Sequence, residues 1–164
     1  MKQDIERGQN SRTVEYLMSR NIIFMEVSAC TACNAANRMV EMKVGSIILT
    51  NNTKPVGIIT EHDLVKNICA SDLIASNIPS ESIMSSPIIM VDKRISVKEA
   101  ANEMIGNNVR HLLVQDSAAH DILGIVTSLD ILNYFKYEGD LEEYAKWESL
   151  PTDNSLQKKL DEQC

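Results

Sequence analysis

Aromatic residues are scarce in this sequence, at 4% of its 164 residues, so its core must be built largely from aliphatic side chains, methionine and alanine. No apolar run approaches the roughly 18 residues that a membrane-spanning helix needs, and the first ten residues are too polar for a signal peptide. The four cysteines are few and unevenly placed, unlike the framework of a small disulfide-rich protein. We therefore expect no association with a membrane and a cytoplasmic location.

Basic charge is also in short supply. The formal net charge is −7: residues 1–78 are neutral overall, residues 79–138 carry −3 and residues 139–164 carry −4. Proteins that bind nucleic acids usually present a concentrated basic face, so we expect no nucleic-acid partner. A small anionic ligand is still compatible with this charge, because a few local donors dominate within a Debye length of about 8 Å.

What the sequence does contain is a duplication. Four pairs of segments correspond at nearly constant offset: 18–25 with 84–91, 33–40 with 98–105, 44–50 with 109–115, and 57–64 with 124–131. Each copy is too small to bury much surface alone. We therefore expect the two copies to pack together about a pseudo-twofold axis.

Each copy predicts the order strand, helix, strand, strand, helix. Apolar positions at helical spacing follow the N-cap candidates Thr31 and Ser96: Ala32, Ala35, Ala36, Met39 and Val40 in the first copy, and Val97, Ala100, Ala101, Met104 and Ile105 in the second. The expected strands are 22–25, 47–49 and 56–59, and 88–91, 112–114 and 122–126. The sequence thus predicts an α/β fold with a flexible lead over 1–11, repeats over 12–72 and 78–137, and an acidic helical tail over 138–164.

The segments GIITEHDL and GIVTSLDI each place a threonine and an aspartate three residues apart, as Thr60 and Asp63 and as Thr127 and Asp130. One interpretation is a capping box that closes the first turn of the following helix. The other is a ligand site, because a helix N-terminus suits a phosphate and a carboxylate one turn inside can accept hydrogen bonds from adjacent sugar hydroxyls. The two interpretations are not exclusive, and both stay open.

Together with the duplication, these motifs resemble a tandem pair of CBS domains, the Bateman module, over roughly residues 12–137. The resemblance implies that Thr60 and Asp63 hold the sugar and phosphate of an adenosine-type ligand in a first cleft, and that Thr127 and Asp130 do so in a second. It also implies that apolar residues of the opposite repeat complete each cleft: Met84, Ile89 and Val109 in the first, and Met18, Ile23 and Val44 in the second. The alternative is that these six residues are simply core.

The resemblance also makes the two clefts different. The second repeat has Arg110 and His111 where the first has Gly45 and Ser46, and His62 stands beside the first signature where the family often has arginine. We therefore expect the first cleft to bind the more highly charged ligand, and to bind a phosphate less tightly as the pH rises past the mid-sixes. The basic residues near the second cleft are Arg20 and Lys43. The alternative is that all these residues are solvated surface charges.

Two features fall outside this interpretation. The segment CTAC, residues 30–33, suggests zinc or redox chemistry, but zinc needs four ligands and no second pair has suitable spacing. A thioredoxin-like pattern is also missing, so we expect no metal site and no function for this pair. In the tail we expect a helix that ends before Pro151, with Trp147 packed on the module or on a neighbouring subunit.

The sequence thus predicts a stand-alone regulatory module that binds AMP, ADP, ATP or a related adenosyl compound such as S-adenosylmethionine. By its resemblance we expect it to form a homodimer and to act on an unidentified protein partner through a change in the orientation of its repeats. No nucleophile, base and orienting group converge in the sequence, so we expect neither catalysis nor a required cofactor. The alternative function is an interaction or oligomerisation module with vestigial, empty clefts.

Overall fold

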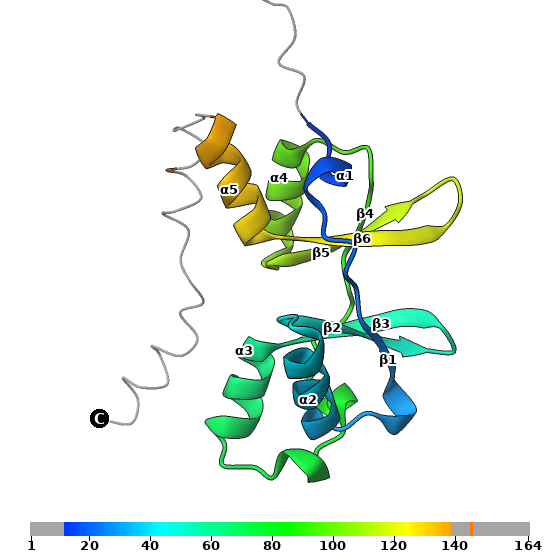
Figure 1. The fold of residues 1–164 in the computed structure, drawn as a ribbon, viewed down its shortest axis with the longest axis vertical. Coiled ribbons are helices and arrows are strands. Elements are labelled where there is room, and N and C mark those ends of the chain that lie inside the picture. The colour runs from blue at the N-terminus through cyan, green and yellow to red at the C-terminus, as the bar shows by residue number, and fades with distance from the viewer. Residues whose placement is uncertain (1–11, 139–144, 146–164) are drawn as a thin grey trace, which may run out of the picture.

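A computed structural model of the protein describes residues 12–138 and residue 145. Its two α/β repeats stack sheet against sheet, with the helices on the outer sides (Figure 1). The first repeat contains β1 (Phe24–Glu26), α2 (Ala32–Met42), β2 (Ser46–Asn51), β3 (Lys54–Thr60) and α3 (Glu61–Leu64). The second contains β4 (Met90–Asp92), α4 (Val97–Asn107), β5 (His111–Asp116), β6 (Asp121–Thr127) and α5 (Ser128–Glu138).

The two sheets have the same topology and the same register. In each, the first strand runs parallel to the second, and the second runs antiparallel to the third. The pair Ser46 and Thr60 begins the β2–β3 ladder, and the pair His111 and Thr127 begins the β5–β6 ladder in the same way. The predicted fold class, an α/β protein of two tandem repeats, is confirmed.

The helices α2 and α4 start where the sequence predicts. Thr31 and Ser96 are their N-caps, and each completes a capping box with the side chain three residues later. The expected apolar stripe is buried as far as Met39 and Met104, except for the half-buried Ala36, and its last positions are exposed, Val40 by 80% and Ile105 by 36%. The physical reason is that these last positions project away from the core that each helix forms with its sheet; Ile105 faces a cavity.

The first strand of each repeat begins two residues later than predicted. Pairing with β2 starts at Phe24, and pairing with β5 starts at Met90. The preceding residues Ile22 and Ile88 pack instead against the cluster between the two sheets. Their apolar side chains are therefore explained by the contact between repeats, which a single-strand pattern does not reveal.

Three apolar clusters hold the molecule together. Each repeat has its own core between its helices and its sheet. A third cluster joins the repeats and consists of Ile48, Ile58, Leu113 and Ile125, none of which is more than 7% exposed. Because these residues come in corresponding pairs from the two sheets, the sheets meet about a pseudo-twofold axis, as expected.

The segment before each repeat packs on the opposite repeat. The helix α1 (Val14–Leu17) lies in the second repeat, where the Val14 amide donates to the carbonyl of Ile95 at 3.0 Å and the Val14 side chain is fully buried. The segment around Met84 packs in the core of the first repeat, and Ser85 pairs with Ile58 of β3. The repeats are therefore spatially interlocked, although their sequences are consecutive.

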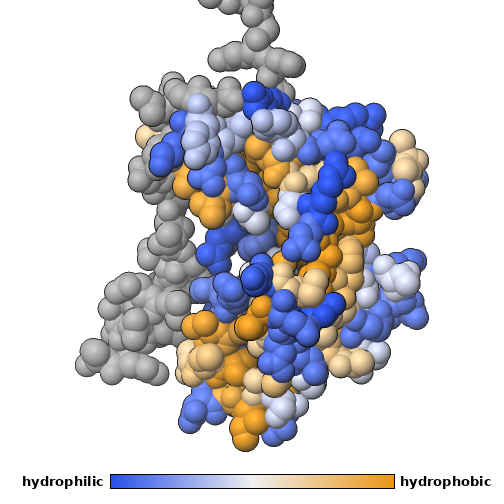
Figure 2. All heavy atoms as spheres, in the orientation of Figure 1, coloured by the Kyte–Doolittle hydropathy of each residue, from blue (hydrophilic) through white to orange (hydrophobic). Residues whose placement is uncertain are grey.

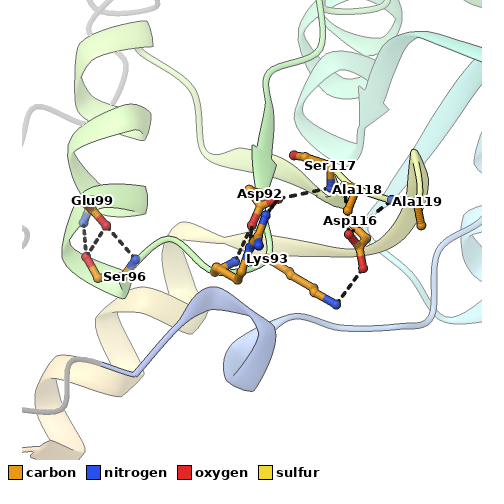
Figure 3. A network of polar contacts seen from close by, with 9 residues as sticks. Asp92, Lys93, Ser96, Glu99, Asp116, Ser117, Ala118 and Ala119 are labelled. Carbon is orange, nitrogen blue, oxygen red and sulfur yellow. Dashed lines mark hydrogen bonds and ion pairs between the residues drawn. The ribbon is translucent and has the colours of Figure 1, made fainter.

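Polar contacts fix the first strand of each repeat to its hairpin. In the second repeat the Lys93 ammonium lies 2.7 Å from a carboxylate oxygen of Asp116, and Asp92 accepts from the Ser117 amide at 3.1 Å (Figure 3). In the first repeat Glu26 takes the place of Asp92, and its carboxylate accepts from the Asn52 amide at 3.0 Å. Hydrogen bonds from Arg94 and Ser117 lower the pKa of Asp92, so this carboxylate stays ionised at neutral pH.

Within residues 12–138, no helix combines the length and the apolar character needed to cross a membrane. The predicted acidic tail, with Trp147 and Pro151, lies outside the described residues apart from Glu138, the last residue of α5, and position 145.

Candidate ligand-binding clefts

A cavity of about 560 Å³ lies between the two repeats. The residues predicted for the first cleft that line it are Thr60, His62, Asp63, Ile89, Val109, Arg110 and His111. They come from α3 and the end of β3 on one side, and from β5 and the segments before β4 and β5 on the other. Hydrophilic residues gather on the surface between α3 and α5, where the two repeats meet (Figure 2). The structure thus brings together most of the first predicted cleft.

Thr60 and Asp63 form a capping box at the start of α3. One carboxylate oxygen, Oδ2, accepts from the Thr60 amide at 2.8 Å and from the Thr60 hydroxyl at 2.7 Å, while the Asp63 amide donates to the Thr60 hydroxyl. Thr127 and Asp130 repeat this arrangement, with distances of 2.8 and 2.6 Å. The capping interpretation is therefore confirmed for both motifs.

Capping uses only half of each carboxylate. Within the described part of the chain, no hydrogen bond reaches Oδ1 of Asp63 or of Asp130. A carboxylate has about four acceptor positions, so Oδ1 has capacity for a ligand hydroxyl while Oδ2 holds the turn. Because the turn is already closed, the carboxylate is oriented before any ligand arrives, which lowers the entropic cost of binding.

His111 lies where the two motifs meet. It is the β5 partner of Thr127, and it lines both the large cavity and a smaller one beside it. Burial, with a smaller contribution from the neighbouring Arg110 charge, lowers the pKa of His111 below its usual value, and Asp63 and Asp130 oppose this shift. His111 is therefore neutral at neutral pH while no anion is bound.

Sequence reasoning missed nine residues that line the first cavity, among them Lys66, Ile105 and Asn108. Lys66 follows Asp63 by three positions, which places both on one face of a helical turn, and this spacing was the available indication. The π-helical turn Val65–Cys69 that continues α3 was not predictable from the apolar pattern.

Met84 and Met18 do not line either cavity. Met84 packs against the core of the first repeat and Met18 against that of the second. A Cβ atom placed on Gly57 would lie 2.5 Å from the Met84 sulfur, and one on Gly124 would lie 2.7 Å from the Met18 sulfur. The glycines of the two motifs therefore make room for these methionines, which we had predicted to line the clefts.

The second predicted cleft is only partly assembled. A cavity of about 290 Å³ brings Thr127 together with Gly45, Glu61 and Leu129, and also with residues of the first cleft, including His111 and Arg110. Asp130, Ile23 and Val44 line neither cavity. Ile23 packs against the core of the first repeat, and Val44 is half-buried after α2.

Cys30, the first cysteine of the CTAC segment, makes a structural contact. The Cys30 side chain is 4% exposed, and its sulfur accepts a hydrogen bond from the buried Ser80 hydroxyl at 2.9 Å. This contact ties the segment between the repeats to the start of α2. Within the described residues, no group of three or more histidine, cysteine and acidic side chains has the arrangement of a metal site.

Comparison with known proteins decides the family. Residues 14–70 and 80–137 each match the CBS domain. The chain belongs to the CBS domain family. Its CBS repeats agree with the two halves seen in the structure, and the tandem CBS resemblance inferred from the sequence is confirmed.

Relatives of this CBS protein match the larger part of its chain. An uncharacterized protein of Methanopyrus kandleri is 35% identical over 108 residues, which cover 65% of this chain and 55% of that protein. An uncharacterized 17.7 kDa protein of Acidianus ambivalens is 32% identical over 125 residues, covering 76% and 69%. The chain thus spans about half the length of the first relative and just over two thirds of the second.

A solved structure resembles the module as well. The CBS domain pair of protein MJ0100, in complex with 5′-methylthioadenosine and S-adenosyl-L-methionine, is 26% identical with a TM-score of 0.65. The match covers 77% of this chain and 97% of that one.

Proposed function

We propose that this CBS pair is a regulatory module that binds an adenosine nucleotide in its first cleft. The single observation that carries this proposal is the 560 Å³ cavity in which the Thr60–Asp63 motif faces Arg110 and His111 of the other repeat. The volume suits a small ligand. A carboxylate oxygen for sugar hydroxyls and cationic groups for a phosphate stand on opposite walls, as a nucleotide requires.

The charge of the cavity favours AMP, ADP or ATP there over an uncharged nucleoside. Arg110 offers a planar fork that binds phosphate oxygens in pairs, and Lys66 adds a second permanent cation. A bound phosphate would raise the pKa of His111, which the free protein holds low. We therefore expect AMP to bind more tightly at about pH 6 than at about pH 8.

The related domain pair solved with 5′-methylthioadenosine and S-adenosyl-L-methionine supports an adenosyl ligand in the clefts of this chain too. Binding between the repeats would change their relative orientation and so carry the ligand signal to a protein partner. We further propose that two copies pair, that the module works in the cytoplasm, and that it acts without catalysis.

Calorimetric titration with AMP, ADP, ATP and S-adenosylmethionine tests the proposal. We expect at least one nucleotide to bind, and a ligand at about 100 times its Kd to stabilise the fold by about 2.7 kcal/mol in thermal unfolding. Asp63→Ala should abolish nucleotide binding in the first cleft, whereas Glu81→Gln, an exposed acidic residue outside the cavities, should leave it unchanged.

The same titration distinguishes the alternative function. An interaction module with empty clefts would bind none of the four ligands, and Asp63→Ala would then change only stability. Since the Asp63 carboxylate also caps α3, this variant should lose about 1 kcal/mol of stability, so binding is compared well below the unfolding temperature.

A further inference from the structure

The pseudo-twofold axis pairs residues of the first repeat with residues of the second, and several of these pairs differ in charge. Glu61 follows Thr60 as Ser128 follows Thr127. The Glu61 amide donates to the carbonyl of Gly45 at 3.1 Å, and the Ser128 amide donates to the carbonyl of Arg110 at 3.0 Å. The two backbones therefore make the same hydrogen bond at this position, and only the side chains differ.

The Glu61 carboxylate lies over Gly45. A Cβ atom placed on Gly45 would be 3.6 Å from the Glu61 carboxylate, and its three nearest neighbouring atoms all belong to that carboxylate. In the second repeat the side chain of Arg110 starts from this same position, with the small Ser128 beside it. Where one repeat presents a guanidinium, the other thus presents a carboxylate.

The remaining pairs extend this difference. Lys66 and His62 of the first cleft correspond to Asn133 and Leu129 of the second repeat, since each pair follows its motif at the same spacing. Lys43 corresponds to Asn108 and is exposed at the end of α2. Two permanent cations, Lys66 and Arg110, line the first cavity with one carboxylate, Asp63, whereas Arg110 is the one permanent cation that lines the smaller cavity with the Glu61 carboxylate, among the described residues.

We propose that the second cleft selects adenosyl ligands that carry no phosphate, with a neutral or positively charged group in its place, and that Glu61 determines this specificity. A sulfonium, as in S-adenosylmethionine, would be attracted to the Glu61 carboxylate, while a nucleotide phosphate would be repelled by it. The cavity that contains Glu61, Gly45, Leu129 and Thr127 places the carboxylate beside the second motif. This inference rests on the proposed function, because it assumes that Thr-x-x-Asp motifs hold the sugar.

The experiment uses the full chain with Asp63→Ala, which leaves only the second motif intact, and titrates it with S-adenosylmethionine and with AMP. We expect S-adenosylmethionine to bind at least about tenfold more tightly than AMP, which corresponds to a difference of about 1.4 kcal/mol in binding free energy. Adding Glu61→Gln, which keeps the shape of the side chain, should reduce this ratio by about tenfold or more.

A charge exchange between repeats provides the stronger variant. Gly45→Arg with Glu61→Ser gives the first repeat the residues that the second has as Arg110 and Ser128. Gly45 has room for a side chain once Glu61 is shortened. In the Asp63→Ala background this exchange should reverse the preference, so that AMP binds more tightly than S-adenosylmethionine. The matched control, Ser128→Glu in an Asp130→Ala background, should weaken AMP in the first cleft.

Each outcome has one meaning. If Asp63→Ala binds AMP as tightly as S-adenosylmethionine, binds neither, or keeps its preference after Glu61→Gln and after the charge exchange, the inference is overturned. If the unmodified protein binds no adenosine compound at all, the proposed function fails first. Loss of AMP binding with Asp63→Ala, together with retained S-adenosylmethionine binding that depends on Glu61, supports both.

Discussion

Gly57 and Gly124 lie where another segment of chain crosses the last strand of each sheet. A Cβ atom on Gly57 would come within 2.9 Å of the Ser85 carbonyl oxygen, and one on Gly124 within 2.8 Å of the Ser19 carbonyl oxygen. Both oxygens are backbone atoms of the segments around Ser85 and Ser19, which precede one repeat and pack on the other; we call these the exchanged segments. They cannot move aside without breaking the pairing of Ser85 with Ile58 or of Ser19 with Ile125. The glycine of each motif is thus required by tertiary packing.

Substituting Gly57 with alanine should therefore destabilise the protein by about 1–3 kcal/mol, the usual cost of overpacking a core. Gly106→Ala is the matched control, since a Cβ there would meet nothing within 4 Å and Gly106 lies in α4. It should be neutral or stabilise by up to about 1 kcal/mol. Urea unfolding monitored by circular dichroism measures both, and equal effects of the two changes would contradict this explanation.

His111 should make the stability of the ligand-free protein depend on pH. Its pKa is lowered in the folded state by burial and by Arg110, so below about pH 6.5 the unfolded chain binds more protons than the folded one. The contribution of neutral His111 is complete above that pH and is lost as the pH falls toward the lowered folded pKa.

We expect His111→Gln to lose less stability than the parent between about pH 7 and about pH 5.5, where carboxylates with ordinary pKa values remain mostly ionised. The measurement is the difference in free energy of unfolding between the two proteins at each pH. A difference that does not change over this range would show that His111 is not the group that titrates.

At the scale of elements, the exchanged segments decide which parts depend on one another. The helix α1 precedes the first repeat in sequence, yet Val14 is fully buried in the core of the second. The Val97 amide donates to the Arg12 carbonyl, which fixes this segment to the start of α4. The stability of the second repeat therefore depends on residues that precede the first.

Val14→Ala removes buried apolar volume and should cost about 1–3 kcal/mol. Glu15→Gln lies in the same short helix but on its exposed side, and it should change stability by less than about 0.5 kcal/mol. Hydrogen exchange should show that Val14→Ala lowers the protection of amides in β5. Lowered protection in the first repeat alone would instead place α1 outside the second core.

On the scale of the whole molecule, the inter-sheet cluster and the two exchanged segments should make the repeats unfold as one unit. Ile59 lies in the core of the first repeat and is fully buried. Ile59→Val should cost about 0.5–1.5 kcal/mol and lower hydrogen-exchange protection equally in β2 and in β5, since both strands open only in global unfolding. Asn102→Ala, exposed on α4, is the control. Loss of protection confined to β2 would indicate independent repeats.

Much of the fold followed from local spacing along the chain. The N-caps Thr31 and Ser96 depend on residues within one helical turn, and the strands depend on short apolar runs, so the sequence predicted them within two residues. The capping role of Asp63 was predictable for the same reason. Ile22 and Ile88 were assigned to strands because a short pattern cannot distinguish burial within a sheet from burial between two sheets.

The sequence by itself determined the duplication, the order of elements in each repeat and the two Thr-x-x-Asp turns, because each depends on residues a few positions apart. Only the tertiary structure decided that Met18 and Met84 lie in opposite cores, that Lys66 and Ile105 enter the cavity, and that Glu61 lies over Gly45. These contacts depend on how the two sheets face each other and on which segment crosses which strand. Both are fixed by packing between residues far apart in the chain, which produces no periodic pattern in the sequence.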